Sequence, residues 1–212
     1  MSEIKVDKIS PQSGTALAVG DSGDTITIPS GATITNSGTA TGFGGGKILQ
    51  CVSITKTDQQ STSTTGTFAV VEFGSSPYGL AITPTATSSK IFVTLGLALS
   101  AYGRYTMCQL FRDATQVGMG DTSGSRTRVF LSDAHSNESV TSLTQTYLMG
   151  NMSMSFMDEP NTTSEIKYYV KCGTGIGYSA STPFHINRTH QLYAHAQDAV
   201  GISTLTLFEI GA

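Results

Sequence analysis

Residues 89–103 read SKIFVTLGLALSAYG, and this stretch decides the fold class. Large apolar side chains occupy every second position, and the positions between them are mostly smaller or more polar. A period of two residues is that of a β-strand, whose successive side chains point to opposite faces of a sheet. The stretch therefore predicts a long strand with one face in a hydrophobic core, formed by Ile91, Val93, Leu95, Leu97, Leu99 and Ala101.

Strand-like runs continue on both sides of this stretch, from Lys47 to the C-terminus. Segments rich in Ser, Thr, Asn, Asp and Gly separate them, and no segment sustains the 3.6-residue period of a helix. Many short strands without intervening helices are typical of sandwiches and jelly rolls. We therefore expect an all-β, jelly-roll-like antiparallel β-sandwich over residues 47–212. Its expected strands are 47–57, 67–73, 79–85, 89–103, 105–113, 127–132, 142–158, 165–172, 184–187 and 203–211.

The composition excludes several classes of protein. Only 13% of the 212 residues are charged, about half of the usual fraction of roughly 25%. The net charge is −3, and the densest basic cluster is Arg126 with Arg128, whereas a nucleic-acid ligand needs many clustered cations. No apolar run is long enough to span a membrane, and the N-terminus MSEIKVDK lacks the apolar stretch of a signal peptide. We therefore expect a protein made in the cytosol, without membrane insertion or export by the usual route.

The three cysteines, Cys51, Cys108 and Cys172, are far apart in the sequence, and each lies in an apolar, strand-like run. An odd number without CxxC spacing does not suggest a disulfide framework or a zinc site. The pattern predicts buried free thiols.

The N-terminal part has a different composition. More than half of residues 10–46 are Ser, Thr or Gly, and GDTITIPS at 23–30 is followed by a looser copy, GATITNSG, at 31–38. The glycines of GFGGGK, at 42–47, indicate a hinge. Alternating Thr and Ile predict short strands, but one chain offers Ile26, Ile28 and Ile34 too few apolar partners for a core. Two interpretations stay open: a flexible linker, or a stalk ordered by several identical chains.

Motifs for catalysis and cofactor binding are absent. GFGGGKI lacks the first Gly and the final Ser or Thr of a phosphate-binding loop, and no GxSxG is present. The spacing of His185, His190 and His195 matches no zinc-hydrolase motif, so we interpret them as polar loop residues; metal binding at the axis of an oligomer is the alternative. The adjacent acids of DEPN, at 158–161, suggest a turn. The expectation is a protein that is not an enzyme and has no cofactor.

The chain resembles tail-fibre-type structural proteins of marine bacteriophages, particularly those of cyanophages. The similarity lies in several separated motifs, which are MSEIKVDKISPQSGTAL, DSGDTITIPSGATI, ITPTATSSKIFV, QLFRDATQVGMGD, SFMDEPNTTSEIKYYV, INR at 186–188 and the terminal STLTLFEIGA. The resemblance implies a homotrimer with a virion-docking arm at residues 1–20, a repeat stalk and Gly hinge at 21–46, and a knob at 47–212. It carries no catalytic residues.

The leading hypothesis from the sequence is a non-enzymatic virion appendage, a short tail fibre or fibre-like protein. Its N-terminus would bind other virion proteins, and its knob would attach to a glycan or protein of the host surface. The weak receptor-binding candidates are Tyr102, Tyr178, Arg126 and Arg128. The alternatives are a structural adaptor, a head fibre or a decoration protein without a receptor and, with less support, an envelope polysaccharide depolymerase.

Overall fold

The chain divides into two compact units, Met1–Phe43 and Gly44–Ala212, which are described separately. The computed structural model contains no membrane-spanning helix in the part of the chain that it describes. The described residues are 9–33, 35, 37–38, 48–64, 67–101, 105–134, 149–174, 182–190, 196 and 198–211.

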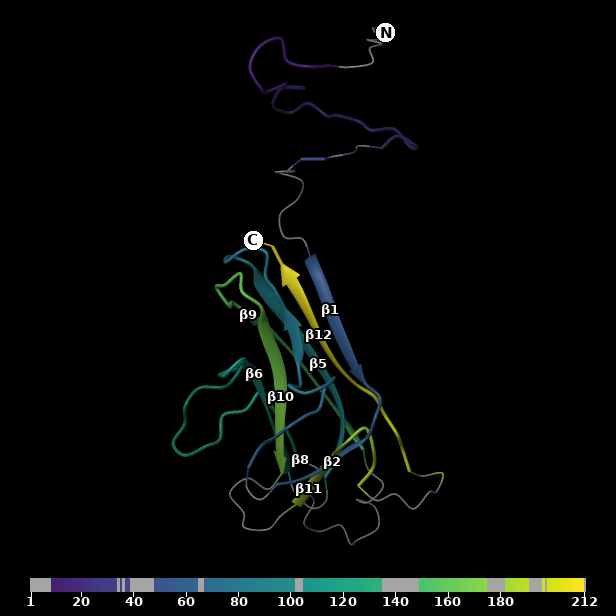
Figure 1. The fold of residues 1–212 in the computed structure, drawn as a ribbon, viewed down its shortest axis with the longest axis vertical. Coiled ribbons are helices and arrows are strands. Elements are labelled where there is room, and N and C mark those ends of the chain that lie inside the picture. Colours follow the sequence, from purple (N-terminus) through teal and green to yellow (C-terminus); the bar gives the residue numbers. More distant parts are fainter. Residues whose placement is uncertain are drawn as a thin grey trace. The chain divides into compact units, whose positions relative to one another are not determined.

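The C-terminal unit consists of two antiparallel sheets that pack against each other (Figure 1). The first sheet contains β1 (Ile48–Lys56), β2 (Gln60–Thr64), β5 (Lys90–Ala101), β9 (Gly150–Asp158), β11 (Thr182–Ile186) and β12 (Ser203–Ile210). The second contains β3 (Ala69–Val70), β4 (Leu80–Ile82), β6 (Tyr105–Arg112), β7 (Thr115–Val117), β8 (Leu131–Ala134) and β10 (Ile166–Thr174). The predicted all-β sandwich is therefore confirmed.

Strand β5 organises the first sheet, because it pairs with β9, β11 and β12. Its alternating apolar residues are at most 3% exposed, as the sequence period predicts. They pack against side chains of the second sheet, which include Leu110, Tyr168 and Val170, each 0% exposed. The core therefore lies between the two sheets and has β5 at its centre.

A buried polar contact joins the two sheets across the core. Asp158, on β9, accepts hydrogen bonds from Arg112 on β6 (2.7 Å) and from the Tyr168 hydroxyl on β10 (2.6 Å). Burial, together with this bond to Asp158, raises the pKa of Tyr168 far above its usual value. Asp158 is 6% exposed, so the bonds from Arg112 and Tyr168 compensate for the desolvation of its carboxylate.

The strand predictions fail in three places. Strand β7 (Thr115–Val117) has no counterpart among them, because the expected strands end at 113 and resume at 127. Strand β2, QSTST, has no counterpart among them because it carries no apolar alternation; it lies at the edge of the first sheet, beside β11. Strand β8 begins at Leu131, whereas the prediction was 127–132. The residues before it form the loop that returns to β6, where the amide of Phe130 donates to the carbonyl of Cys108.

The prediction of three buried thiols is correct for two of them. Cys108 and Cys172 are 0% exposed, but Cys51 is exposed. Cys51 belongs to the outward-facing set of β1, with Ser53 and Thr55, whereas Val52 and Ile54 face the core. The face of the strand that a cysteine occupies decides whether its thiol is buried, and an apolar run alone does not show which face that is.

On the outer face of the first sheet, the middle cross-strand rows of β1, β12, β5 and β9 carry no charged side chain; Lys90, at the start of β5, lies at one end of this face. One cross-strand row is apolar and runs from Cys51 through Phe208 and Phe92 to Met157. The next rows carry hydroxyl groups and one glycine, contributed by Ser53, Thr206, Thr94, Ser155, Thr55, Thr204, Gly96 and Ser153. An uncharged area of this kind suits contact with another protein surface.

In the N-terminal unit, two turns repeat at the interval of the sequence repeat. The amide of Asp24 donates to the carbonyl of Asp21, and eight residues later the amide of Ala32 donates to that of Pro29. Gly23 and Gly31 occupy matching places in the two turns, with φ of 98° and 86°, values that suit glycine. The chain therefore turns at the Ser-Gly pairs of residues 22–23 and 30–31.

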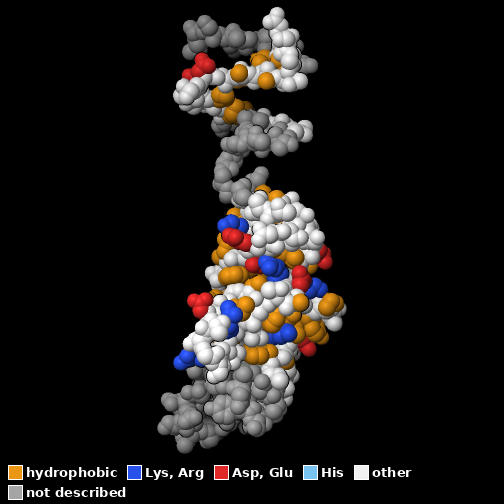
Figure 2. Space-filling view, turned by 90° about the vertical axis from the view of Figure 1, so that its left-hand side faces the viewer, with side chains coloured by type: hydrophobic (Ala, Val, Ile, Leu, Met, Phe, Trp, Pro, Cys, Tyr) orange, Lys and Arg blue, Asp and Glu red, His pale blue; other side chains and the backbone are white. Residues whose placement is uncertain are grey.

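The described residues of this unit form no strand in the single chain. Ile26 and Ile28 are 60% and 46% exposed, and Ile34 lies outside the described residues. Figure 2 shows apolar side chains on the surface of this unit, where Asp21 and Asp24 are the only charged residues described. Within one chain, Ile26 and Ile28 are therefore not buried in a core.

Candidate functional site

A row of polar and aromatic side chains lies on the outer face of β10. Alternation along the strand buries Tyr168 and Val170 and turns Lys167, Tyr169 and Lys171 outward. Tyr169 pairs with Phe111 on β6, and the two rings stack with centroids 5.3 Å apart and planes 12° apart.

The ammonium group of Lys171 lies over this ring pair. Its Nζ is 4.4 Å from the centroid of Phe111 and 5.7 Å from that of Tyr169, within the range of cation–π attraction. Within the described part of the chain, no carboxylate pairs with this ammonium. Phe111, Tyr169 and Lys171 together are called the aromatic platform below.

The loop of residues 74–79 forms a second wall beside the platform. Lys167 donates through Nζ to the carbonyl of Pro77 at 3.0 Å. Gly79 has a φ of 125°, and a Cβ atom there would lie 2.5 Å from the carbonyl oxygen of Tyr168. Glycine is therefore required for the loop to pass this close to β10.

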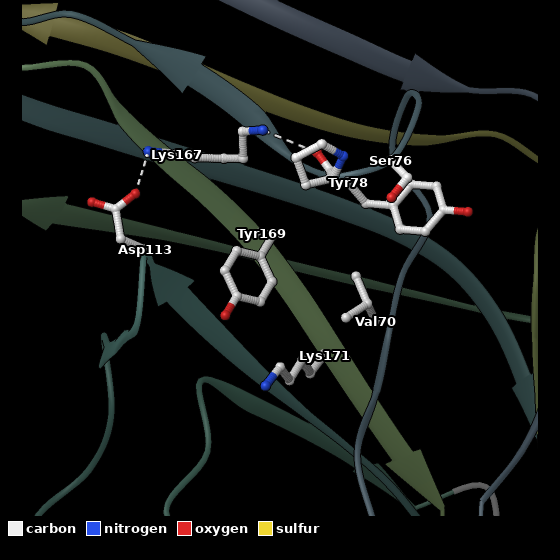
Figure 3. A pocket seen from close by; sticks show the side chains of 8 residues that line it. Val70, Ser76, Tyr78, Asp113, Lys167, Tyr169 and Lys171 are labelled. Carbon is white, nitrogen blue, oxygen red and sulfur yellow. Dashed lines mark hydrogen bonds between the residues drawn. The ribbon is translucent and has the colours of Figure 1, made fainter.

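Between the platform and the loop lies an open pocket of about 430 Å³ (Figure 3). In Figure 3, Lys167, Tyr169 and Lys171 project from β10, with Asp113 on one side and Val70, Ser76 and Tyr78 on the other. The carboxylate of Asp113 accepts from the amide of Lys167 at 3.0 Å. We call this hollow the β10 pocket; its lining residues are Val70, Ser76, Pro77, Tyr78, Asp113, Lys167, Tyr169 and Lys171.

The chemistry of the β10 pocket is that of a shallow binding site. Aromatic rings offer apolar faces, while two ammonium groups, a carboxylate and hydroxyl groups offer hydrogen bonds around them. A sugar ring presents the complementary pattern, with an apolar face and hydroxyl groups at its edge. The rings and hydrogen-bonding groups of this arrangement suit the binding of such a ligand.

Of the candidate receptor residues from the sequence, Arg126 and Arg128 do not line the β10 pocket. Arg126 is exposed in the loop between β7 and β8, where it donates to the Ser123 hydroxyl at 2.7 Å. Arg128 donates to the carbonyl of Gly120 at 2.6 Å and lines a second open hollow of about 700 Å³, beside Phe130 and Phe156. Tyr102 and Tyr178 lie outside the described residues. The two described candidates, Arg126 and Arg128, lie in the same loop and bond to different partners.

Two of the three candidate histidines are in contact. His185 Nε2 and His190 Nδ1 are 3.0 Å apart, and His185 Nδ1 shares a 2.8 Å hydrogen bond with the Ser61 hydroxyl. Arg188 donates to that same hydroxyl at 3.2 Å. His185 belongs to β11 and is 6% exposed, so its interpretation as a surface loop residue is wrong.

The Ser61–His185–His190 contact is poorly suited to proton abstraction near neutral pH. Burial, and to a lesser degree the charge of Arg188 and the contact with His190, lowers the pKa of His185 to about 4. Burial and Arg188 also lower the pKa of His190. A general base works best with a pKa near the working pH, and an imidazole with a pKa near 4 is a weak base.

The third candidate metal ligand, His195, lies outside the described residues. Across the described ranges, no group of three or more His, Cys, Asp or Glu side chains is arranged to hold a metal ion.

Comparisons with known proteins give no family for this chain. No protein-family model matches it, and no curated protein matches its sequence. Similar solved structures include the infectious bursal disease virus VP2 subviral particle, with 14% identity over 77% of this chain and a TM-score of 0.35. Structures of the Gt and Gx strains of the same virus match with 13% and 14% identity over 76% of this chain, with TM-scores of 0.32 and 0.31. This chain spans 38% to 40% of the length of those proteins.

The sequence analysis missed the aromatic platform. The signal was present in EIKYYVKC, where a period of two places Lys167, Tyr169 and Lys171 on the face opposite Tyr168 and Val170. The partner ring of Phe111 and the wall at 74–79 come from distant segments. Only strand pairing brings these segments beside β10.

Proposed function

We propose that this chain is a non-enzymatic appendage of a virus particle, and that its β-sandwich attaches to a saccharide through the β10 pocket. The observation that carries the attachment role is the aromatic platform. Its stacked rings, beside hydrogen-bonding groups, match the apolar face and the hydroxyl-bearing edge of a sugar ring. The resemblance to marine phage tail-fibre-type proteins supports the virion role. The chain would then be assembled into particles in the host cytoplasm.

The charge of the pocket favours an acidic saccharide. Two ammonium groups and one carboxylate line it, and Lys171 has no anionic partner in the described part of the chain. A sugar carboxylate or sulfate beside Lys171 would supply that partner. A single open pocket binds weakly, so useful adhesion requires several linked copies acting together.

The proposal includes a homotrimer held by the N-terminal unit. The exposed Ile26 and Ile28 support it, because equivalent residues of neighbouring chains would bury one another. The uncharged rows on the outer face of the first sheet offer a second surface for contact between copies. Residues 1–20 would dock the appendage to other virion proteins.

A saccharide-binding assay with the full chain tests the proposal. Immobilised acidic and neutral polysaccharides from bacterial envelopes would be probed with wild-type protein, Tyr169→Ala and Arg126→Ala. We expect wild type to prefer acidic polymers and Tyr169→Ala to bind about fivefold more weakly, since it removes a stacking face worth roughly 1 kcal/mol. Arg126→Ala, outside the pocket, should bind like wild type.

Other outcomes would contradict the proposal in distinct ways. Binding that is lost in Arg126→Ala but kept in Tyr169→Ala would move the receptor site to the loop between β7 and β8. Absence of binding to every saccharide would favour the structural adaptor, head fibre or decoration protein. Release of reducing sugar from the polymers would show a depolymerase.

A further inference from the structure

Two buried cysteines face each other across neighbouring strands of the second sheet. Cys108 on β6 pairs directly with Cys172 on β10 in the antiparallel register. Both are 0% exposed, and their sulfur atoms are 2.7 Å apart. Non-bonded carbon atoms pack at about 3.5–4.0 Å, and sulfur is the larger atom, so this contact is unusually close for two separate thiols.

The backbone geometry at this pair is compatible with a covalent bond. Directly opposed residues of antiparallel strands have Cα atoms about 4.5 or 5.5 Å apart, depending on their place in the hydrogen-bond pattern. Disulfides are found with Cα separations of roughly 4.4–6.8 Å. The bond therefore requires no displacement of β6 relative to β10.

We propose that Cys108 and Cys172 form a cross-strand disulfide when the protein meets an oxidising environment. The inference is independent of the proposed saccharide site and stands on the register and the sulfur contact alone. Cys51 takes no part in it, because it is exposed on the outer face of the other sheet.

The oxidant is a low-molecular-weight disulfide of the glutathione type. The thiolate of one cysteine attacks a sulfur of that disulfide and displaces a small thiolate, which leaves a mixed disulfide. The thiolate of the second cysteine attacks the protein sulfur of the mixed disulfide and displaces the other small thiolate. Two protein thiols are oxidised, one small disulfide is reduced to two thiols, and the two cysteine protons pass to the released thiolates.

Burial makes this reaction slow in the folded protein. Desolvation, together with the contact to Cys108, raises the pKa of the Cys172 thiol well above its usual value, so little reactive thiolate is present. The bond should form during folding, or when β6 and β10 separate locally. An oxidant present during refolding is therefore the appropriate probe.

The bond would lie directly behind the aromatic platform. Phe111 stands three residues after Cys108 on β6, and Lys171 precedes Cys172 on β10. The disulfide would therefore link the two strands that carry the platform. It would also close a long loop, between residues 64 positions apart, and loops of this length give large stabilisation.

Refolding of the full chain with the Cys51→Ser substitution tests the inference. The protein would be refolded from denaturant with oxidised glutathione or with dithiothreitol, then denatured, alkylated and analysed by mass spectrometry. We expect no alkylated cysteine after oxidative refolding, a linked peptide that contains Cys108 and Cys172, and two alkylated cysteines after reduction. The oxidised protein should melt roughly 10 °C above the reduced protein.

The matched control is Cys108→Ala in the same background, or Cys172→Ala if the first variant does not fold. Its melting temperature should be the same in both redox buffers. Alkylation of both Cys108 and Cys172 after oxidative refolding would overturn the inference, and this readout needs no core variant. A melting temperature that rises with oxidation in the Cys→Ala control would also overturn it.

Discussion

At the residue scale, Asn187 connects four parts of the sandwich. Its Nδ2 donates to the carbonyl oxygens of Lys56 (2.8 Å) and Asp58 (3.0 Å), and its Oδ1 accepts from the Ser203 hydroxyl (2.7 Å). Its own amide donates to the carbonyl of Ala98. The residue is 0% exposed and has a φ of 63°, a conformation that asparagine tolerates better than most residues.

We expect Asn187→Ala to lower the free energy of unfolding by about 2–4 kcal/mol. The change removes the side-chain donor to the buried carbonyl of Lys56 and the part-buried carbonyl of Asp58, removes the acceptor of the Ser203 hydroxyl, and places alanine in a left-handed conformation. Chemical denaturation of the wild type and the variant measures the difference. Asn161→Ala is the control, because Asn161 also has a positive φ (53°) but bonds only within its own exposed turn. Equal losses in the two variants would contradict the role of Asn187.

A second residue-scale prediction concerns pH and His185. The pKa of His185 is about 4 in the folded protein, against 6.5 ordinarily, so the unfolded chain binds the proton first as pH falls. Stability should therefore decrease as pH falls from about 6.5 towards 4, by on the order of 1 kcal/mol for this group. His185→Asn should flatten the dependence in that window when denaturation midpoints are compared.

The carboxylate of Glu209 should affect stability at a lower pH than His185 does. Burial alone would raise its pKa, but hydrogen-bond donors, Thr85 and Gln50 among them, lower it to about 2. Its contribution is present above about pH 4.5 and is lost as pH falls towards 2. Between pH 6.5 and 4.5 the two effects can be separated. If the stability of His185→Asn falls as much as that of the wild type in this range, the loss of stability does not come from His185.

At the element scale, the loop of residues 74–79 depends on Gly79. Gly79→Ala should destabilise the sandwich by about 2–4 kcal/mol, because a Cβ at a φ of 125° would meet the Tyr168 carbonyl at 2.5 Å. The loop would shift, and saccharide binding would weaken with it. Denaturation and the polysaccharide assay measure the two effects.

Gly120→Ala, in the loop between β7 and β8, provides the matched control for Gly79→Ala. Nothing lies within 4 Å of a Cβ at Gly120, and its φ is not in the left-handed region. Its stability should stay within about 0.5 kcal/mol of wild type. A Gly79→Ala protein as stable as Gly120→Ala would show that the close approach of the loop to β10 is not required.

At the scale of the whole molecule, assembly should depend on the N-terminal unit and folding should not. We expect Ile26→Asp with Ile28→Asp to convert an oligomer into monomers, because charged residues cannot be buried in a shared apolar contact. The unfolding free energy of the sandwich should change by less than about 0.5 kcal/mol. Sedimentation velocity and denaturation report the two quantities.

Thr25→Asp with Thr27→Asp is the control for charge alone. These threonines alternate with the isoleucines, so the double substitution adds the same charge and leaves Ile26 and Ile28 in place. The control should remain assembled. Wild-type protein that is monomeric at micromolar concentration would contradict the stalk hypothesis. Equal dissociation of the two double variants would show that added charge, and not loss of the isoleucines, separates the chains.

The sequence by itself determined the β class and the inward faces of the long strands. In SKIFVTLGLALSAYG and STLTLFEIG, one sheet face is buried, so the two-residue period appears directly in the order of the side chains. Strand β2 was not predicted because it lacks such an apolar face. Its residues are polar and lie at a sheet edge, where no core selects for alternation.

Only the tertiary structure decided which residues meet. The Phe111–Tyr169 stack, the contact of His185 with His190 and the Cys108–Cys172 pair all depend on strand register or on how the chain turns between strands. A period shows which face a residue occupies but not which strand lies beside it. The order of strands is set by the packing of the whole sandwich, because every strand must find both a hydrogen-bonding neighbour and a place in the common core.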